Sequence, residues 1–222
     1  MSAGSDSVFV AGGTGYIGRP LIENLVVRGY AVVALVREGS QARLAPGARP
    51  VFGNALDAGT FAAAVPRGAT IVHLVGTPHP GPGKAADFVR VDLASIRATT
   101  AAAAASAAKH LVYVSVAHPA PVMRAYIAAR MEGEALVRAT GIPATILRPW
   151  YVLGPGHYWP YLLVPLYALF RLLPATRTHA ERLGLVTRSE MVSALVQAIV
   201  APPADGVSIV DVPGIRAARK SG

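Results

Sequence analysis

Short runs of β-branched and aliphatic residues alternate along this chain with longer stretches of helical character, and this alternation constrains the fold more than any other feature. It is typical of βαβ units, in which crossover helices join parallel strands. Strands are predicted at Ser7–Ala11, Ala31–Val36, Arg49–Gly53, Thr70–Val75, His110–Ser115 and Ala144–Arg148. Helices are predicted at Tyr16–Arg28, Asp57–Val65, Ala85–Ala108 and Val122–Thr140. We therefore expect an α/β domain with a parallel sheet.

Composition predicts one domain that spans residues 1–222. Apolar residues make up 53% of the chain and charged residues 15%, which suits a globular protein. The chain has no cysteine, which excludes disulfides, thiolate catalysis and cysteine-bound zinc, and which fits a reducing cytoplasm. The polar start, Met1 to Ser7, is not typical of a signal peptide. We expect a cytoplasmic protein.

The chain is basic, with a net charge of +9. A basic balance raises nucleic acid or an anionic membrane as possible partners. However, the sequence contains no block of five or more consecutive Lys and Arg residues. We expect a generally basic surface and no nucleic-acid partner.

Beyond Pro149 the pattern changes. The stretch Tyr158–Pro174 is apolar and rich in aromatic residues, yet it is short for a membrane span. Two prolines and one arginine interrupt it: Pro160, Pro165 and Arg171. A helix is predicted at Ser189–Val200 and a last strand at Val207–Val212. We expect these later pieces to cover the carboxyl edge of the sheet, with residues 150–185 as an apolar cap on the substrate side.

Three glycines, Gly12, Gly15 and Gly18, follow the first predicted strand and open the first predicted helix. The G-x-x-G-x-x-G pattern is weak by itself, but a strand before it and an amphipathic helix after it are the context of a dinucleotide site. Glycines let backbone amides close on a pyrophosphate at the positive end of the helix. The loop predicts a Rossmann-type doubly wound sheet; the alternative is a tight turn that binds nothing. The expected cofactor contacts of the loop are Gly12, Thr14, Gly15, Tyr16, Ile17 and Gly18.

Arg37 follows the second predicted strand, where an acidic residue usually binds the adenosine ribose. A guanidinium favours a 2′-phosphate, which a carboxylate would repel. Arg19, directly after the third glycine, could support the same phosphate. Either arginine could instead be solvated. We expect NADP(H) to be favoured over NAD(H).

Five segments occur in the order seen in short-chain dehydrogenases/reductases: Gly12–Gly18, Gly53–Asp57, Leu111–Ser115, Tyr126–Arg130 and Thr145–Pro149. The chain resembles the atypical, NmrA-like branch of that family over nearly its whole length. It is also similar to the NAD(P)H-binding accessory subunit of respiratory complex I. The resemblance implies that Asn54 borders the adenine at a position that is usually acidic, and that the backbone of Gly76 passes close to the cofactor. The further cofactor contacts that it implies are Ala55, Leu56, Ser115, Arg130, Pro149 and Val152.

The resemblance also implies catalytic residues, because active members use a Ser, a Tyr and a Lys four residues after the Tyr. Tyr126 matches the Tyr, and Arg130 stands at the Lys position. An arginine keeps the charge that assists a phenol, but it never gives up its proton. Ser115 is the candidate serine, although Ala117 is an alternative equivalent. Tyr126, Arg130 and Glu134 share one helix face, which could also be an exposed polar stripe with an Arg–Glu pair.

Two functions remain open. The first is an NADP(H)-dependent oxidoreductase acting on a small apolar carbonyl, enone or quinone, with aromatic residues lining the pocket: Trp150, Tyr158, Trp159 and Tyr161. The second is a catalytically silent NADP(H)-binding redox sensor or assembly factor. The apolar stretch predicts a contact with a further surface. We expect this contact to be a homodimer interface rather than a peripheral membrane surface. The six histidines are dispersed, and no cluster of carboxylates lies beside them in the sequence. Their spacing does not predict a metal site, so no metal ligand is assigned.

Overall fold

The computed structural model describes residues 6–78, 80–120, 122–155 and 183–221. Its centre is a parallel sheet of seven strands in the order β3-β2-β1-β4-β5-β6-β9. The strands are β1 (Ser7–Ala11), β2 (Ala31–Val36), β3 (Arg49–Phe52), β4 (Thr70–His73), β5 (His110–Val114), β6 (Ala144–Leu147) and β9 (Val207–Val210). The predicted doubly wound, Rossmann-type α/β fold is therefore confirmed.

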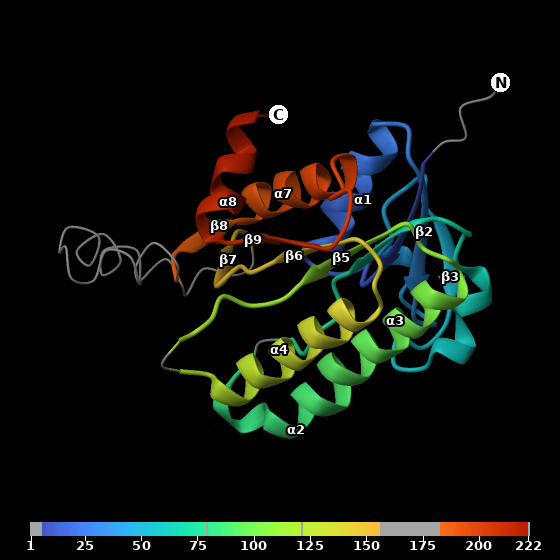
Figure 1. Ribbon diagram of the computed structural model, residues 1–222. Coiled ribbons are helices and arrows are strands. Elements are labelled where there is room, and N and C mark those ends of the chain that lie inside the picture. Colours follow the sequence, from blue (N-terminus) through green and yellow to red (C-terminus); the bar gives the residue numbers. More distant parts are fainter. Residues whose placement is uncertain (1–5, 79, 121, 156–182, 222) are drawn as a thin grey trace.

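Helices cover both faces of this sheet (Figure 1). On one face lie α1 (Gly18–Val27) and α7 (Arg188–Val200), which pack beside each other. On the other lie α3 (Ala94–Ala105) and α4 (Arg124–Ala139). Each face has its own apolar core, and the strands between them are almost continuously buried, as expected for a parallel sheet.

The strand order places a topological switch at the carboxyl ends of β1 and β4. The chain leaves β1 through α1 toward β2 on one side, whereas β4 lies on the other side of β1. Ligands of open α/β sheets bind in the crevice at such a point. The turn Gly12–Gly18, which follows β1, therefore opens at this crevice.

Two of the predicted helices are wrong in detail. Asp57–Val65 forms two 3₁₀ turns, Ala58–Thr60 and Ala62–Ala64, rather than one helix. Asp57 caps the first turn, because its carboxylate accepts a hydrogen bond from the Gly59 amide, and the backbone leaves the helical conformation at Phe61, where φ is −143°. The predicted helix Ala85–Ala108 begins as the short α2 (Ala85–Asp87), continues as a π-helical segment η5 (Phe88–Leu93), and only then becomes α3.

The C-terminal part also differs from the prediction. The last strand does not cap the carboxyl edge, because β9 pairs with β6 and extends the main sheet. A small second sheet forms instead from β7 (Tyr151–Leu153) and β8 (Leu185–Thr187). A short helix, α8 (Val212–Ala217), follows β9 and was not predicted. The apolar stretch Tyr158–Pro174 and most of the expected cap lie outside the described residues.

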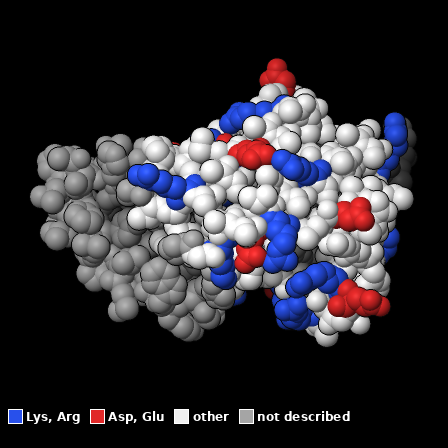
Figure 2. Space-filling view, turned by 90° about the horizontal axis from the view of Figure 1, so that it is seen from below, with Lys and Arg blue, Asp and Glu red and all other residues white. Residues whose placement is uncertain are grey.

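Charged side chains are interspersed on the face that carries α3 and α4 (Figure 2). Basic and acidic groups alternate there, as in the pair formed by Arg97 of α3 and Glu132 of α4. Among the described residues, no helix combines the length and the apolar character needed to cross a membrane.

Candidate dinucleotide and catalytic site

The turn between β1 and α1 forms a close-packed glycine cradle. Gly12 has a φ of 92°, a left-handed conformation that favours glycine. A side chain on Gly18 would collide with the carbonyl oxygen of Gly12 and with the Cα of Gly13. The first turn of α1 can approach the loop this closely only because Gly18 has no Cβ. The cradle thus holds the start of α1 against the end of β1.

The amino end of α1 is open to an anion. Its N-cap residue, Ile17, provides no side-chain hydrogen bond, and the first turn contains no acidic residue. The first amides of a helix carry partial positive charge and need acceptors. An uncapped amino end above a glycine cradle fits a pyrophosphate.

The other predicted residues of this loop have partners within the protein. Tyr16 lies under the guanidinium of Arg188, which is 5.0 Å from its ring centre. Ile17 packs against the apolar core beneath α1 and α7. Arg19 forms an exposed ion pair with Glu23 at 3.2 Å. Arg19 is therefore less available for a 2′-phosphate than predicted.

Arg37 and Asn54 follow neighbouring strands at the same edge. Arg37 comes directly after β2 and is exposed, and its side chain makes no hydrogen bond or ion pair within the described part of the chain. Asn54 follows β3, and its side-chain oxygen accepts a hydrogen bond from the amide of Leu56 at 3.1 Å. Ala55 is packed against the core, and Leu56 is partly exposed. The carboxyl ends of β1, β2 and β3 therefore bring these residues to one edge.

Arg130 of α4 is buried, and two of its guanidinium nitrogens contact groups of the protein. Its guanidinium forms an ion pair with Asp92 of η5 at 2.7 Å and donates a hydrogen bond to the carbonyl oxygen of Val114 at 2.9 Å. Burial lowers the pKa of this arginine, but Tyr126, Tyr113 and Asp92 together raise it by more, so the pKa lies above its ordinary value. Arg130 is a fixed cation.

Tyr126 lies between an aromatic ring and this cation. The Phe88 ring centre is 5.0 Å from that of Tyr126, and the Arg130 guanidinium carbon is 5.3 Å from the Tyr126 ring centre. The structure therefore brings Tyr126 and Arg130 together, as their spacing of four on a helix predicts. The tyrosine is half-buried, whereas the arginine is buried beneath it.

Ser115 has a different partner. Its hydroxyl donates a hydrogen bond of 2.7 Å to the Glu134 carboxylate. A serine has one proton to donate. While the Ser115 hydroxyl donates its hydrogen bond to the Glu134 carboxylate, it cannot donate one to a substrate carbonyl. The alternative equivalent, Ala117, is buried and has no hydroxyl.

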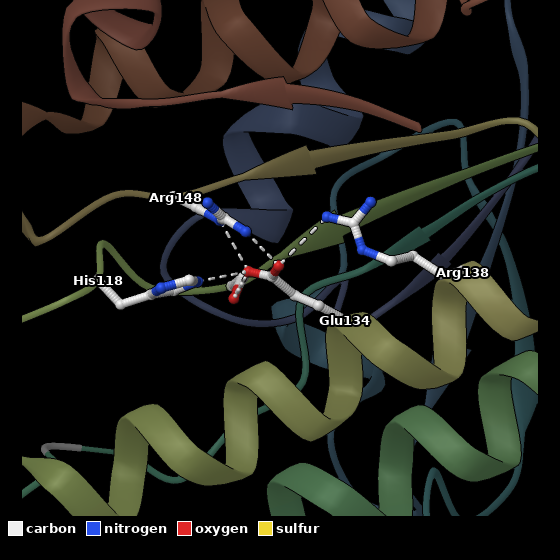
Figure 3. A network of polar contacts seen from close by, with 5 residues as sticks. His118, Glu134, Arg138 and Arg148 are labelled. Atoms are coloured by element: carbon white, nitrogen blue, oxygen red, sulfur yellow. Dashed lines mark hydrogen bonds and ion pairs between the residues drawn. The ribbon is translucent and has the colours of Figure 1, made fainter. Parts of the chain in front are cut away.

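Glu134 is the centre of a buried polar cluster (Figure 3). Arg148, which follows β6, binds both carboxylate oxygens, at 2.9 and 2.5 Å. His118 and Arg138 approach the same carboxylate at 3.4 and 3.7 Å. Burial raises the pKa of Glu134, but the hydrogen bonds from Arg148 and Ser115 outweigh it, so the pKa is lowered and the group is a carboxylate.

The alternative interpretation of the α4 face is therefore wrong. Arg130 and Glu134 do not form an exposed stripe with a pair between them, because both are buried. Each instead pairs with a residue from another element, Arg130 with Asp92 and Glu134 with Arg148. The sheet and η5 cover the face that could have been solvated.

Pro149 and Val152 close the edge beside β6. The carbonyl oxygen of Pro149 accepts a hydrogen bond of 2.8 Å from the amide of Ala117, which ties the loops after β5 and β6 together. Val152 lies in β7 and packs partly against the core. Trp150 meets the Tyr151 ring edge-on at 5.4 Å. The other aromatic residues of the expected pocket, Tyr158, Trp159 and Tyr161, lie outside the described residues.

Sequence reasoning missed three buried polar residues near this site, Thr77, His73 and Asp92. Both the amide and the hydroxyl of Thr77 donate to Asp92, at 2.9 and 2.5 Å. His73, at the end of β4, lies between the hydroxyls of Thr99 and Ser95. The available signal for Asp92 was a single carboxylate in the run Phe88–Leu93, whose other residues are four apolar residues and Arg90.

Comparison with known proteins identifies the family. A family model described as NAD(P)H-binding matches residues 12–156. The chain belongs to this NAD(P)H-binding family. The match begins at the glycine cradle and ends beyond β7, so it includes both α4 and the loop after β6.

Relatives of this NAD(P)H-binding protein include two named reductases. It is 29% identical over 168 residues to a 4-hydroxy-2-methyl-3-oxo-4-farnesyl-3,4-dihydroquinoline-1-oxide ketoreductase of Stigmatella aurantiaca, covering 66% of this chain and 50% of the relative. It is 33% identical over 165 residues to the chloroplastic divinyl chlorophyllide a 8-vinyl-reductase of Oryza sativa subsp. indica, covering 67% of this chain and 40% of the relative. The chain thus spans half or less of the length of these relatives.

A solved structure has the same fold. The enzyme WbmG of Bordetella bronchiseptica in complex with NAD matches with a TM-score of 0.69 and 19% identity, over 95% of this chain and 74% of that one. At this identity the likeness establishes the fold. Together with the family match, it agrees with a dinucleotide site at the crevice between β1 and β4.

Proposed function

We propose that this protein is an NADP(H)-dependent oxidoreductase of the short-chain dehydrogenase/reductase type, acting on a small apolar carbonyl, enone or quinone. The observation that carries the proposal is the uncapped amino end of α1 above the glycine cradle, with Arg37 exposed at the end of the next strand. An anion site and a free guanidinium at one edge suit a pyrophosphate and a 2′-phosphate.

Each half of the cofactor has its own set of residues. The amides of the Gly12–Gly18 turn bind the pyrophosphate, Arg37 binds the 2′-phosphate, and the Asn54–Leu56 segment borders the adenine. Gly76 and Pro149, in the loops after β4 and β6, would hold the nicotinamide half. When bound, the cofactor supplies or accepts a hydride at the nicotinamide.

Tyr126 is the proposed proton donor. In carbonyl reduction its phenol gives a proton to the oxygen while the carbonyl carbon receives the hydride. The Arg130 guanidinium carbon lies 5.3 Å from the Tyr126 ring centre, so a fixed cation stands beside the proposed donor. Arg130 itself transfers no proton. Ser115 is not retained as a donor, because its hydroxyl already donates a hydrogen bond to Glu134.

The substrate class is supported by the relatives. Their names describe a ketoreductase of a farnesylated dihydroquinoline oxide and a reductase of a vinyl group. Both names describe reductases, one of a keto group and one of a vinyl group. We therefore retain an apolar carbonyl, enone or quinone as substrate, with the NmrA-like branch, the complex I subunit and a cytoplasmic homodimer as further predictions.

A second function is favoured by one specific observation. Arg130 and Ser115 both direct their polar hydrogens to groups of the protein, Asp92, Val114 and Glu134. A protein with these groups occupied could hold NADP(H) without turnover, as a redox sensor or an assembly factor. Hydride transfer from NADPH to a model quinone such as menadione, followed at 340 nm, decides between the two.

Cofactor choice is tested by titrating NADPH and NADH into the wild type and the Arg37→Asp variant. We expect the variant to weaken NADPH by roughly 2–3 kcal/mol, the scale of a lost charged hydrogen bond, and to spare NADH. Arg28→Asp makes the same charge change at the opposite end of α1 and is the matched control. Equal losses for both cofactors in the Arg37 variant would refute the assignment.

A further inference from the structure

A buried carboxylate connects the loop after β4 to two helices. Asp92 of η5 has a side chain with 0% exposure. One of its oxygens accepts both hydrogen bonds from Thr77, and the other forms the ion pair with Arg130 of α4. Arg130 in turn holds the carbonyl of Val114 at the end of β5. Loop, helices and strand end therefore meet at one charge pair.

The loop at this charge pair reaches the dinucleotide cradle at its other end. Leu74 donates its amide hydrogen to the carbonyl of Ala11 at 2.9 Å, and its backbone lies 3.0 Å from where a Cβ of Gly12 would be. Two residues further on, a Cβ on Gly76 would overlap the Arg130 guanidinium. The segment Leu74–Thr77 is thus fixed between the cradle and the charge pair.

The contact with Arg130 gives a structural reason for a glycine at position 76. The resemblance predicts that its backbone lies close to the cofactor. The structure adds that the guanidinium of Arg130 occupies the space on which a side chain would project. The cation determines where this stretch of backbone can lie.

The burial of this pair separates it from ordinary surface ion pairs. Arg97 and Glu132 also link α3 to α4 at 2.7 Å, but their side chains are 57% and 51% exposed. Exposed pairs contribute little, whereas removing one partner of a buried pair leaves an uncompensated charge. A fully buried carboxylate with three polar contacts cannot touch a ligand, so its effect must pass through the groups that it holds.

We propose that the Asp92–Arg130 pair is a positioning device that fixes the segment Leu74–Thr77 as the wall of the nicotinamide half of the dinucleotide site. The inference rests on the proposed cofactor site. It makes Asp92 a positioning residue, because it acts through Thr77 and Arg130. The adenine half, built on β2 and β3, lies on the other side of the cradle and does not depend on this pair.

The test compares a whole and a truncated ligand. NADPH carries both halves, whereas adenosine 2′,5′-bisphosphate carries only the adenine half. For Asp92→Asn, which keeps the shape and removes the charge, we expect the Kd of NADPH to rise at least about tenfold and that of the bisphosphate to change less than about twofold. Titrations are made at 15 °C on variants shown to be folded by circular dichroism.

Two further variants keep the test decisive if Asp92→Asn folds poorly. Thr77→Val keeps the ion pair and removes one hydrogen bond to Asp92, and we expect the same selective loss on a smaller scale. Glu132→Gln is the control, because it breaks the exposed pair between α3 and α4, and the binding of neither ligand should weaken.

Thermal unfolding separates positioning from stability. We expect Asp92→Asn to lower Tm by about 10 °C, and the neutral double variant Asp92→Asn/Arg130→Gln to regain part of that Tm without regaining NADPH affinity. If Asp92→Asn and Thr77→Val leave NADPH affinity unchanged, or weaken both ligands equally, the inference is overturned while the cofactor site stands. If the wild type binds neither ligand, the proposed cofactor site is wrong, and the inference that rests on it is overturned as well.

Discussion

Histidine 73 makes the stability of this protein depend on pH in a defined window. It is buried at the end of β4, between the hydroxyls of Thr99 at 2.8 Å and Ser95 at 3.3 Å. Burial, and then the charge of Arg130, lower its pKa from 6.5 to about 3. The unfolded chain therefore takes up a proton on this residue below pH 6.5, whereas the folded chain does so only near pH 3. Stability falls as the pH is lowered through this window.

The size of the effect follows from the width of the window. At pH 5 the medium is about 1.5 units below the unfolded pKa and still above the folded one, which corresponds to a loss of about 2 kcal/mol relative to neutral pH. His110, whose pKa burial and Lys109 lower to about 4, adds a loss in the same range. Half of the histidine-dependent loss should therefore disappear when His73 alone is replaced.

Urea unfolding at pH 7, 6 and 5 measures this loss for the wild type and for His73→Asn. The amide keeps polar contacts to the two hydroxyls but does not titrate. We expect the variant to be less stable at pH 7 and to lose about 2 kcal/mol less than the wild type between pH 7 and 5. All other titrating groups are shared by the two proteins. An equal loss in both would refute the conclusion that His73 is neutral in the folded state.

Three further predictions concern the site. Gly18→Ala should abolish NADPH binding and lower stability, because its Cβ would overlap the Gly12 carbonyl, and unchanged fluorescence titration would contradict the cradle. Tyr126→Phe should lower kcat by about 10²–10⁴-fold with little change in NADPH affinity, and a small change in kcat would exclude it as proton donor. Glu134→Gln should cost about 2–3 kcal/mol in urea unfolding, since it leaves the Arg148 charge uncompensated, whereas Glu132→Gln should cost less than about 1.

The core of the fold could be predicted from the sequence because its signals are local. Six strand predictions match the observed strands to within two residues, since buried parallel strands consist of short β-branched runs between turns. Ser7–Ala11 and Ala31–Val36 match in full. The dinucleotide turn was also predictable, because close packing at Gly18 requires a glycine at a fixed distance from the strand.

The remaining differences come from contacts between distant segments. The sequence of β9 has the same strand pattern as the others. Its place beside β6 depends on where α7 ends relative to the sheet, and no local sequence pattern shows this. The predicted helix Asp57–Val65 has an acceptable composition, but its backbone is interrupted at Phe61, where φ is −143°. The π-helical segment before α3 contains a buried carboxylate, Asp92. Its partners are Thr77, 15 residues earlier in the sequence, and Arg130, 38 residues later.

Helix α4 shows how these contacts give one residue a role that its type alone does not reveal. The sequence places an arginine at a position where a lysine is expected. From the sequence, only the positive charge of this residue could be used to infer a role. In the structure, Arg130 is anchored to Asp92 on the η5 side, and one turn later Glu134 is anchored to Arg148 on the β6 side. Anchors of opposite sign on successive turns fix both the rotation and the height of the helix against the sheet. Tyr126, one turn before the first anchor, is therefore placed by both charge pairs.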